Sequence, residues 1–256
     1  MLKYTFFDTE SAWDEALHEG ARHIDPSVQP HHRIGSKRIF AAACFDVTLA
    51  SDGAISCDGM ASWTERDYGD EREIVDRFFN HLRARADRTA IGFGSVATDL
   101  PLLQLAAMEY SLQLPGHFLA QGRKIGSPVF AGRHFDLGLA MKGSGRTWHH
   151  LSEVILRLGL PAELMTTKKH VQFPTTSEGW ADAVAHVELD CALLSVAHLA
   201  WSRAQGQAYL NAKLAALVVL EWLLRNRTLT EQVRTKVVST CAELSMTIRE
   251  QAAIAA

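Results

Sequence analysis

MLKYTFFDTE, residues 1–10, predicts a β-strand that ends in two carboxylates. Side chains alternate along a strand, so Asp8 and Glu10 fall on one face together with Tyr4 and Phe6. Carboxylate oxygens are the ligands that hard cations such as Mg²⁺ prefer. We therefore expect a metal site at the C-terminal end of this strand, completed by ligands from later segments. An Asp-x-Glu spacing by itself equally fits a strand that runs into a solvated acidic turn.

The composition predicts a globular protein with one domain, or with one domain and an appendage. The 256 residues are 47% hydrophobic and 21% charged, with a formal net charge of −3. A nucleic-acid-binding surface would therefore be local, because the chain has no overall basic field. Four scattered cysteines without a C-x-x-C pair argue against a zinc site and a disulfide framework. We expect a cytoplasmic protein without a membrane span, since the apolar run Leu214–Leu224 is too short and contains Glu221.

Two runs after the first strand predict a β-hairpin. Residues 38–50 and 54–63 are strand-like and are joined by Ser51-Asp52-Gly53, in which Asp-Gly favours a tight turn. Residues 71–86 have the apolar spacing of an amphipathic helix, and residues 89–94 form a short apolar strand. We expect a mostly antiparallel unit of three strands, with the strand at 89–94 buried beside the first one.

Asp99 stands at the start of the next helical pattern, shortly after that strand. One interpretation is helix capping, in which Thr98 or Asp99 accepts bonds from the free amides and Pro101 occupies the first turn. The other is that the Asp99 carboxylate also faces the metal, because it lies at the C-terminal edge of the same sheet. The sequence leaves both interpretations open.

A long apolar helix is predicted from Glu178 to about Ala204, and it contains His186 and Asp190. These two residues are four apart and therefore share one helical face. A carboxylate within such an apolar run needs a partner, because buried charges are rarely unpaired. A metal ion would supply one, and a salt bridge or a solvated edge is the alternative. Two more helices are expected within residues 208–255.

The order of these acidic residues resembles that of the DEDD superfamily of 3′–5′ exonucleases. It looks most like the predicted exonucleases related to the proofreading domain of family B DNA polymerases. The first family motif, Phe-Asp-x-Glu, is present at residues 7–10, and the third, Tyr-x-x-x-Asp, is met by residues 186–190. The other motifs are matched by Gly92-Phe93-Gly94-Ser95 with Thr98-Asp99-Leu100-Pro101, by His134-Phe135-Asp136-Leu137 and by Leu158-Gly159-Leu160-Pro161. The resemblance covers about residues 3–205.

Two positions depart from the family pattern. Gly94 stands where an Asn usually follows Gly-Phe. His186 stands where the family has tyrosine, whereas the histidine of the sister branch lies five residues before the last Asp, at the position of Ala185. One residue on a helix is about 100° of rotation. His186 is therefore a candidate base, a residue that orients the attacking water, or the mark of an altered enzyme.

The resemblance implies a ribonuclease-H-like α/β fold, with a mixed sheet flanked by helices over residues 1–206. Beyond the resemblance, we expect the C-terminal helices to form an extension at 207–256 that packs on this domain. The implied activity is 3′–5′ exonuclease hydrolysis of single-stranded DNA or RNA with two Mg²⁺ or Mn²⁺ ions. The implied metal ligands are Asp8, Glu10, Asp99 and Asp190, and the catalytic set adds His186.

Basic residues in two predicted loops are candidates for phosphate contacts: Arg123, Lys124, Lys168 and Lys169. Solvated loop charge explains them equally well. Two other classes of function stay open. One is a degenerate nuclease that grips single strands without cutting them, and the other is a structural α/β protein whose acids are caps and surface residues. The sequence leaves the oligomeric state and the choice between DNA and RNA undecided.

Overall fold

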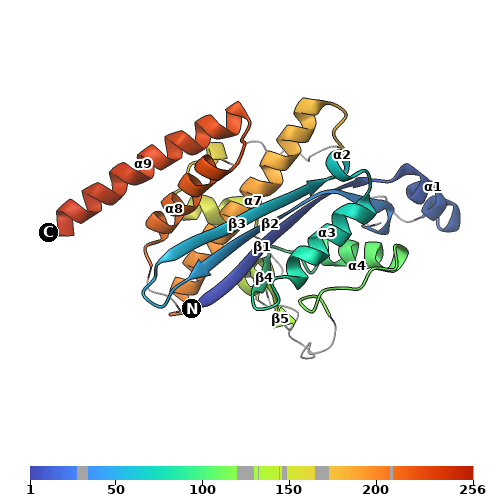
Figure 1. Ribbon diagram of the computed structural model, residues 1–256, viewed down its shortest axis with the longest axis horizontal. Helices are drawn as coiled ribbons and strands as arrows, with labels where there is room; N and C mark the ends of the chain where they lie inside the picture. The colour runs from blue at the N-terminus through green and yellow to red at the C-terminus, as the bar shows by residue number, and fades with distance from the viewer. Residues whose placement is uncertain are drawn as a thin grey trace.

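The computed structural model describes residues 1–27, 34–119, 130–131, 133–143, 145, 149–164, 173–207 and 210–255. These residues form one six-stranded sheet with the order β3-β2-β1-β4-β6-β5 (Figure 1). The strands are β1 (Leu2–Trp13), β2 (Lys37–Leu49), β3 (Ile55–Thr64), β4 (Thr89–Gly92), β5 (Phe130–Ala131) and β6 (His134–Asp136). β1, which carries the two carboxylates and continues beyond them to Trp13, is therefore an inner strand of the sheet.

β1 lies between an antiparallel part of the sheet and a parallel part. It pairs antiparallel with β2 and parallel with β4. The β2–β3 hairpin turns at Gly53, whose φ of 87° is a left-handed conformation that glycine adopts readily. β4 is also parallel to β6, and β5 is the antiparallel edge strand. These pairings confirm the predicted hairpin and the position of residues 89–94 beside the first strand.

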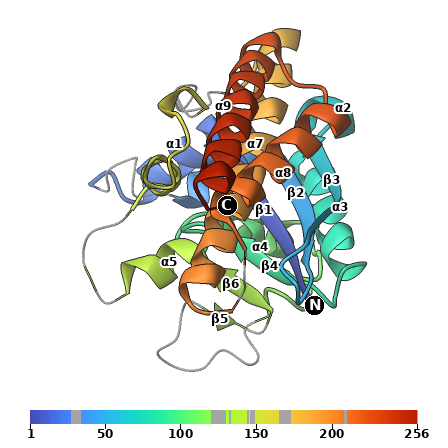
Figure 2. The same ribbon diagram turned by 90° about the vertical axis from the view of Figure 1, so that its left-hand side faces the viewer.

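Helices cover both faces of this sheet. They are α1 (Glu15–Ile24), α2 (Glu65–Tyr68), α3 (Glu71–Arg83), α4 (Asp99–Glu109), α5 (Leu137–Lys142), α6 (Leu151–Arg157), α7 (Ser177–Ala204), α8 (Ala212–Asn226) and α9 (Glu231–Ala255). α3 and α4 lie on one face, while α7 and α8 lie on the other, with α9 outside α8 (Figure 2). Alternation along β1 sends Phe7 into the core under α3 and α4 and sends Phe6 into the core under α7.

This arrangement defines a ribonuclease-H-like α/β fold. The central β1 has an antiparallel hairpin on one side and the parallel strands β4 and β6 on the other, and helices lie on both faces. The fold class predicted from the sequence is therefore confirmed.

α7 is the core helix of one face. In the described part of the chain it alone has the length and hydropathy of a membrane span, a match of length and composition only. Of its most apolar window, 78% is buried inside the protein, as expected for a helix that packs on a sheet.

The C-terminal helices share the core of α7. Apolar residues of α8 and α9, such as Leu220 and Val237, belong to the same buried cluster as Phe6. A buried ion pair adds a polar connection, because Arg227 at the end of α8 donates from Nε to Glu188 Oε2 of α7 at 3.0 Å. Ser62 of β3 donates to the other Glu188 oxygen at 2.7 Å. The helices thus pack on α7 and β3, while the domain boundary at residue 206 stays a prediction.

Candidate active site

The C-terminal half of β1 brings its carboxylates beneath α7. Because Tyr4 and Phe6 lie in the core under α7, the strand alternation places Asp8 and Glu10 on that same face. The carboxylates of Asp8 and Asp190 both add to the raised pKa of the buried Cys191 thiol on α7, of which burial is the main cause. Both aspartates therefore lie close to this part of the helix.

α7 places His186 between two of the predicted acidic residues. His186 Nε2 lies 3.3 Å from Glu10 Oε1 and 3.7 Å from Asp190 Oδ2. The three side chains are only 13–18% exposed. His186 and Asp190 share a helical face because they are one turn apart, as the sequence predicts. The imidazole of His186 is thus directed at the carboxylates.

Asp99 approaches the end of β1 from the opposite face of the sheet. Thr9, between the two β1 carboxylates, donates its hydroxyl to Asp99 Oδ1 at 2.6 Å, and Thr98 donates to Oδ2 at 2.9 Å. Burial raises the pKa of Asp99 despite these bonds, and the charge of Glu10 raises it further. The site therefore contains a buried carboxylate that accepts hydrogen bonds from two neutral hydroxyls and from its own backbone amide, and that lies near a second carboxylate.

Thr98 does not act as the expected side-chain cap of α4. The helix begins at Asp99, and the N-cap residue Thr98 makes no side-chain bond to a free amide of the helix. The expected cap is therefore wrong for Thr98, whereas the Asp99 carboxylate does accept the backbone amide of Asp99 itself. Thr98 instead directs its hydroxyl toward the Asp99 carboxylate and the Gly94 carbonyl oxygen.

A second buried aspartate holds the turn that presents Asp99. Asp136, at the end of β6, accepts hydrogen bonds from the amides of Gly94 at 2.9 Å and Val96 at 2.8 Å. It also accepts from the Leu139 amide at 3.0 Å and so caps α5. An added Cβ at Gly138 would lie 2.7 Å from the Gly94 nitrogen, so this contact requires glycine. The His-x-Asp-Leu segment thus fixes the β4–α4 turn.

The turn between β4 and α4 suits glycine at position 94. Gly94 has a φ of +70°, in the left-handed region that glycine and asparagine adopt more easily than other residues. Glycine therefore forms the turn that leads to Asp99 without backbone strain.

The donor chemistry of the site suits a divalent metal. Carboxylate oxygens dominate the set, which Mg²⁺ and Mn²⁺ favour. The buried Asp99 carboxylate has no cationic partner among the described residues, so a cation would offset the cost of its burial. Within the described ranges, however, no three His, Cys, Asp or Glu side chains are placed to hold one ion. Glu10 and Asp190 instead lie beside His186.

Residues outside this cluster divide into two groups. Arg123, Lys124, Lys168 and Lys169 lie outside the described residues. Thr9 and the anchoring role of Asp136 were missed by the sequence interpretation. The sequence did hold a signal for Asp136, because an Asp directly before the apolar run 137–141 is typical of a helix cap. It held none for Thr9, because the role of Thr9 depends on its contact with Asp99, 90 residues away.

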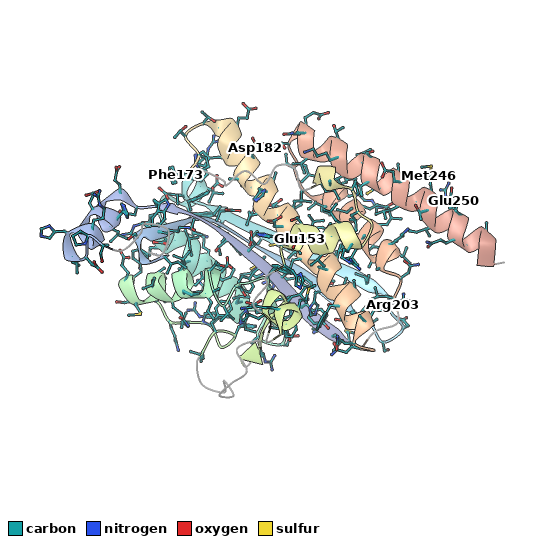
Figure 3. The ribbon with its side chains drawn as sticks, turned by 180° about the vertical axis from the view of Figure 1, so that it is seen from behind. Glu153, Phe173, Asp182, Arg203, Met246 and Glu250 are labelled. Carbon is teal, nitrogen blue, oxygen red and sulfur yellow. The ribbon has the colours of Figure 1, made fainter. Side chains whose placement is uncertain are left out.

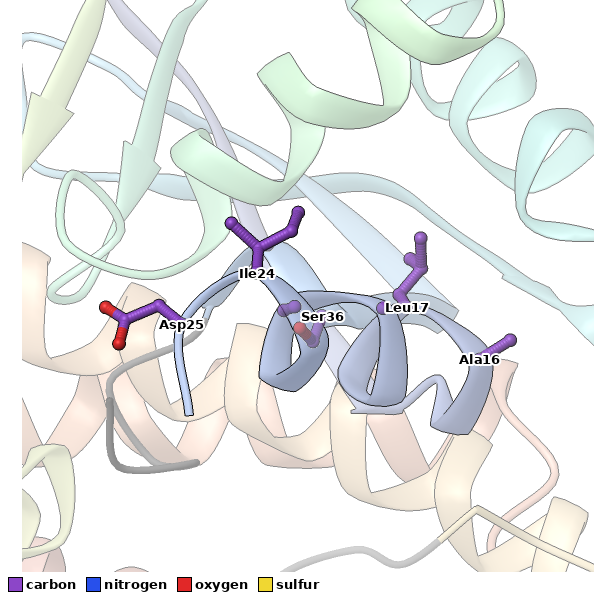
Figure 4. Close-up of a pocket in the computed structure, with 8 residues that line it drawn as sticks. Ala16, Leu17, Ile24, Asp25 and Ser36 are labelled. Carbon is purple, nitrogen blue, oxygen red and sulfur yellow. The ribbon is translucent and has the colours of Figure 1, made fainter. Parts of the chain in front are cut away.

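The structure also has a pocket that lies away from the carboxylates. It has a volume of about 610 Å³ and lies between α1 and residues 34–36 (Figure 4). Its lining is mostly apolar, with Leu17 and Ile24 among the side chains. Among the described residues that line this pocket, Asp25 is the single acidic one. The pocket therefore lacks the group of carboxylates that defines the candidate site.

Comparisons with known proteins leave the family open. No family model matches the chain, and no curated protein matches it in sequence. A solved family B DNA polymerase from the hyperthermophilic archaeon Pyrobaculum calidifontis is similar to it, with a TM-score of 0.47 and 15% identity. That similarity covers 87% of this chain and 29% of the polymerase. E. coli exonuclease I in complex with a dT13 oligonucleotide has a TM-score of 0.35 and 7% identity, over 81% of this chain and 42% of that enzyme. The chain thus spans less than half of either protein, and the fold assignment rests on the strand order.

Proposed function

We propose that this protein is a metal-dependent 3′–5′ exonuclease that hydrolyses single-stranded nucleic acid. The observation that carries the proposal is the convergence of Glu10, Asp99, His186 and Asp190 at the C-terminal end of β1, with Asp8 on the same strand. Acidic residues this close repel one another and repel phosphate unless a cation joins them. A solely structural role for these acids would not explain why Asp99 is buried next to Glu10 without a cation among the described residues.

Each part of the cluster has a separate task in this proposal. Asp8, Glu10, Asp99 and Asp190 would hold two Mg²⁺ or Mn²⁺ ions, which supply Lewis acidity and charge stabilisation at the scissile phosphate. His186 would accept the proton of the attacking water, since an imidazole exchanges protons near neutral pH. Its position 3.3 Å from Glu10 orients the ring toward the site. Thr9 positions Asp99 directly, through a hydrogen bond to its carboxylate. Asp136 positions Asp99 indirectly, because it holds the β4–α4 turn.

The decisive experiment follows 5′-labelled single strands of DNA and RNA with Mg²⁺, with Mn²⁺ and with a chelator. We expect products that shorten stepwise from the 3′ end and that disappear with the chelator. Asp8→Ala should lower the rate by at least about 10³-fold, because the pair of ions is no longer held, while its circular dichroism and melting temperature stay near those of the wild type.

A matched control separates this effect from a contaminating nuclease. Asp182 lies on α7 two turns before Asp190, and it is exposed (Figure 3). Asp182→Ala should therefore retain the wild-type rate. Nuclease activity that survives in purified Asp8→Ala protein would contradict the proposal, and the polymer that is cut decides between DNA and RNA.

One observation favours a second candidate function. His186 lies in contact with Glu10 and Asp190, where a protonated imidazole would neutralise the carboxylates as an ion pair. A protein of this kind would be a degenerate nuclease that binds single strands without cutting them. Strand binding with no shortening under any of the metal conditions would support this binding module instead. Restoring the family residue by His186→Tyr would then be the next variant to assay.

A further inference from the structure

A cleft lined by aromatic residues adjoins the candidate site. It has a volume of about 260 Å³ and is lined by Ala12, Trp13, Asp14, Arg38, Phe40, Glu65 and Phe173. Ala12 lies two residues after Glu10 on β1. It packs in a small apolar cluster with Phe40, Ala41 and Ala183. Ala41 is the strand partner of Glu10, and Ala183 precedes His186 by about one turn of α7. The cleft therefore begins where the carboxylate cluster ends.

Two of the lining aromatic side chains are unusually exposed for their size. Phe173 is 43% exposed and Trp13 is 45% exposed. Phe173 is held by edge-on contacts, with ring centroids 5.6 Å from Phe40 and 5.4 Å from Trp180. Figure 3 shows Phe173 close to the start of α7. A ring fixed at its edges with much of its surface in solvent provides a platform on which a flat ligand can stack.

The charges of the cleft favour a base over a phosphate. Its Arg38 is already bound by Asp14, Glu71 and Glu109. Among the described residues, no hydrogen bond or ion pair reaches the side chain of Glu65. Burial raises the pKa of Glu65, and the neighbouring Asp70 and Glu71 add to this effect. An acidic lining repels phosphate, whereas a carboxylate accepts hydrogen bonds from amino groups.

We infer that this cleft binds an unpaired nucleobase next to the cleaved phosphate, by stacking on Phe173 and Trp13 and by hydrogen bonding to Glu65. This inference rests on the proposed function, because it requires a single strand at the carboxylates. Lys37 lies over Trp13, with Nζ 5.1 Å from the ring centroid, and places a positive charge at the rim for the strand backbone. Glu65 favours adenine, cytosine and guanine, which carry amino donors, over thymine or uracil.

The test measures the binding of short labelled single strands by fluorescence anisotropy. Strands with normal bases are compared with strands whose 3′-terminal nucleotides lack their bases, in the Asp8→Ala background with Mg²⁺ and again with a chelator. We expect removal of the terminal bases to weaken binding about tenfold, the usual effect of one lost stacking contact. Phe173→Ala and Trp13→Ala should each weaken binding of intact strands similarly and leave abasic strands unaffected.

Two further variants separate stacking from general effects. Met246 is 58% exposed on α9 and lies far from Phe173 (Figure 3), so Met246→Ala should leave binding unchanged. Glu65→Gln should reduce the preference for oligodeoxyadenylate over oligothymidylate. Equal binding of intact and abasic strands, or equal losses for both in Phe173→Ala, would overturn the inference.

The outcomes also distinguish this inference from the proposed function. Stepwise 3′ shortening without any dependence on the terminal base would leave the exonuclease in place and remove the base cleft. Base-dependent binding without hydrolysis by the wild type would keep the cleft and remove the exonuclease.

Discussion

Two buried aspartates near opposite ends of β1 have contrasting surroundings. Asp46 lies on β2 beside the N-terminal half of β1, and Asp99 lies at the C-terminal end of the strand. Asp46 accepts a hydrogen bond from Thr5 at 2.6 Å, is ion-paired with Arg85, and has His81 Nε2 at 3.2 Å. Asp99 accepts bonds from two threonine hydroxyls and lies near Glu10.

The pKa shifts of the two groups reflect this difference. Burial raises the pKa of Asp46, but the bonds from His81 and Thr5 and the charge of Arg85 outweigh it, so the pKa is lowered overall. The pKa of Asp99 is raised, because burial dominates and Glu10 adds to it. The chain itself supplies a cation, Arg85, for the first aspartate. For the second aspartate, no cationic partner lies among the described residues.

Substitutions of Asp46 and Asp99 should differ most in their effect on the free energy of unfolding. Asp46→Ala leaves buried donors of Thr5 and His81 without their acceptor, so we expect a loss of about 2–4 kcal/mol in the free energy of unfolding. Asp99→Asn removes a buried charge that lacks a cation, so without metal we expect a gain of about 1 kcal/mol at pH 7. Urea denaturation in the presence of a chelator measures both. A loss of similar size in the two variants would show that Asp99 is a structural residue like Asp46.

The stabilisation caused by metal binding should also distinguish Asp46 from Asp99, although this effect is smaller. At tenfold excess over Kd, an ion that binds only the folded state adds about 1.4 kcal/mol, or about 3 °C in Tm for a chain of this size. We expect this shift with Mg²⁺ or Mn²⁺ in the wild type and in the conservative Asp46→Asn variant. Asp99→Asn should lose most of it. The same shift in Asp99→Asn and the wild type would place the ion elsewhere.

The pH dependence should be the smallest effect and of opposite sign for the two residues. The lowered pKa of Asp46 contributes stability above the unfolded value of about 3.9, and this stability is lost as pH falls through the folded pKa. The raised pKa of Asp99 acts in reverse: its favourable contribution is present below that unfolded value and is lost as pH rises through the folded pKa.

Unfolding curves with a chelator from about pH 3.5 to pH 7 measure these contributions as differences from the wild type. The advantage of Asp99→Asn should grow as the pH rises, and the disadvantage of Asp46→Asn should shrink as the pH falls. An Asp99→Asn difference that stays constant with pH would mean that Asp99 does not titrate in this range.

Local patterns were sufficient for most of the fold. The hairpin, the strand at 89–94 and the helices at 71–86 and 178–204 follow from alternation, helical spacing and turn residues, which act over a few residues. The first strand was expected to end at its two carboxylates, at residue 10, whereas α1 begins only at Glu15. The reason is that β1 continues to Trp13 by pairing with Lys37, an interaction that no short stretch reveals.

The candidate site was predictable only in part. Its order of acidic residues is visible in the sequence, but the burial of each acid is not. The buried acid of α7 that most needs a partner is Glu188, which is fully buried, rather than Asp190. Its cation is Arg227, 39 residues further along, so no local spacing could indicate the pair. Phe173 was likewise missed, because only the packing against Phe40 and Trp180 turns a loop residue into a platform.

The pair of Glu188 and Arg227 also sets an order of events during protein synthesis. Translation proceeds from the N-terminus, so each candidate site residue emerges from the ribosome before Arg227 does. Until then Glu188, between His186 and Asp190 on α7, has a buried charge without its cation, and the helix is not yet held in place. A nascent chain therefore carries all the candidate site residues before the cation that α7 needs has been made. Products of premature termination before residue 227 should likewise lack this ion pair and be less stable than the full chain.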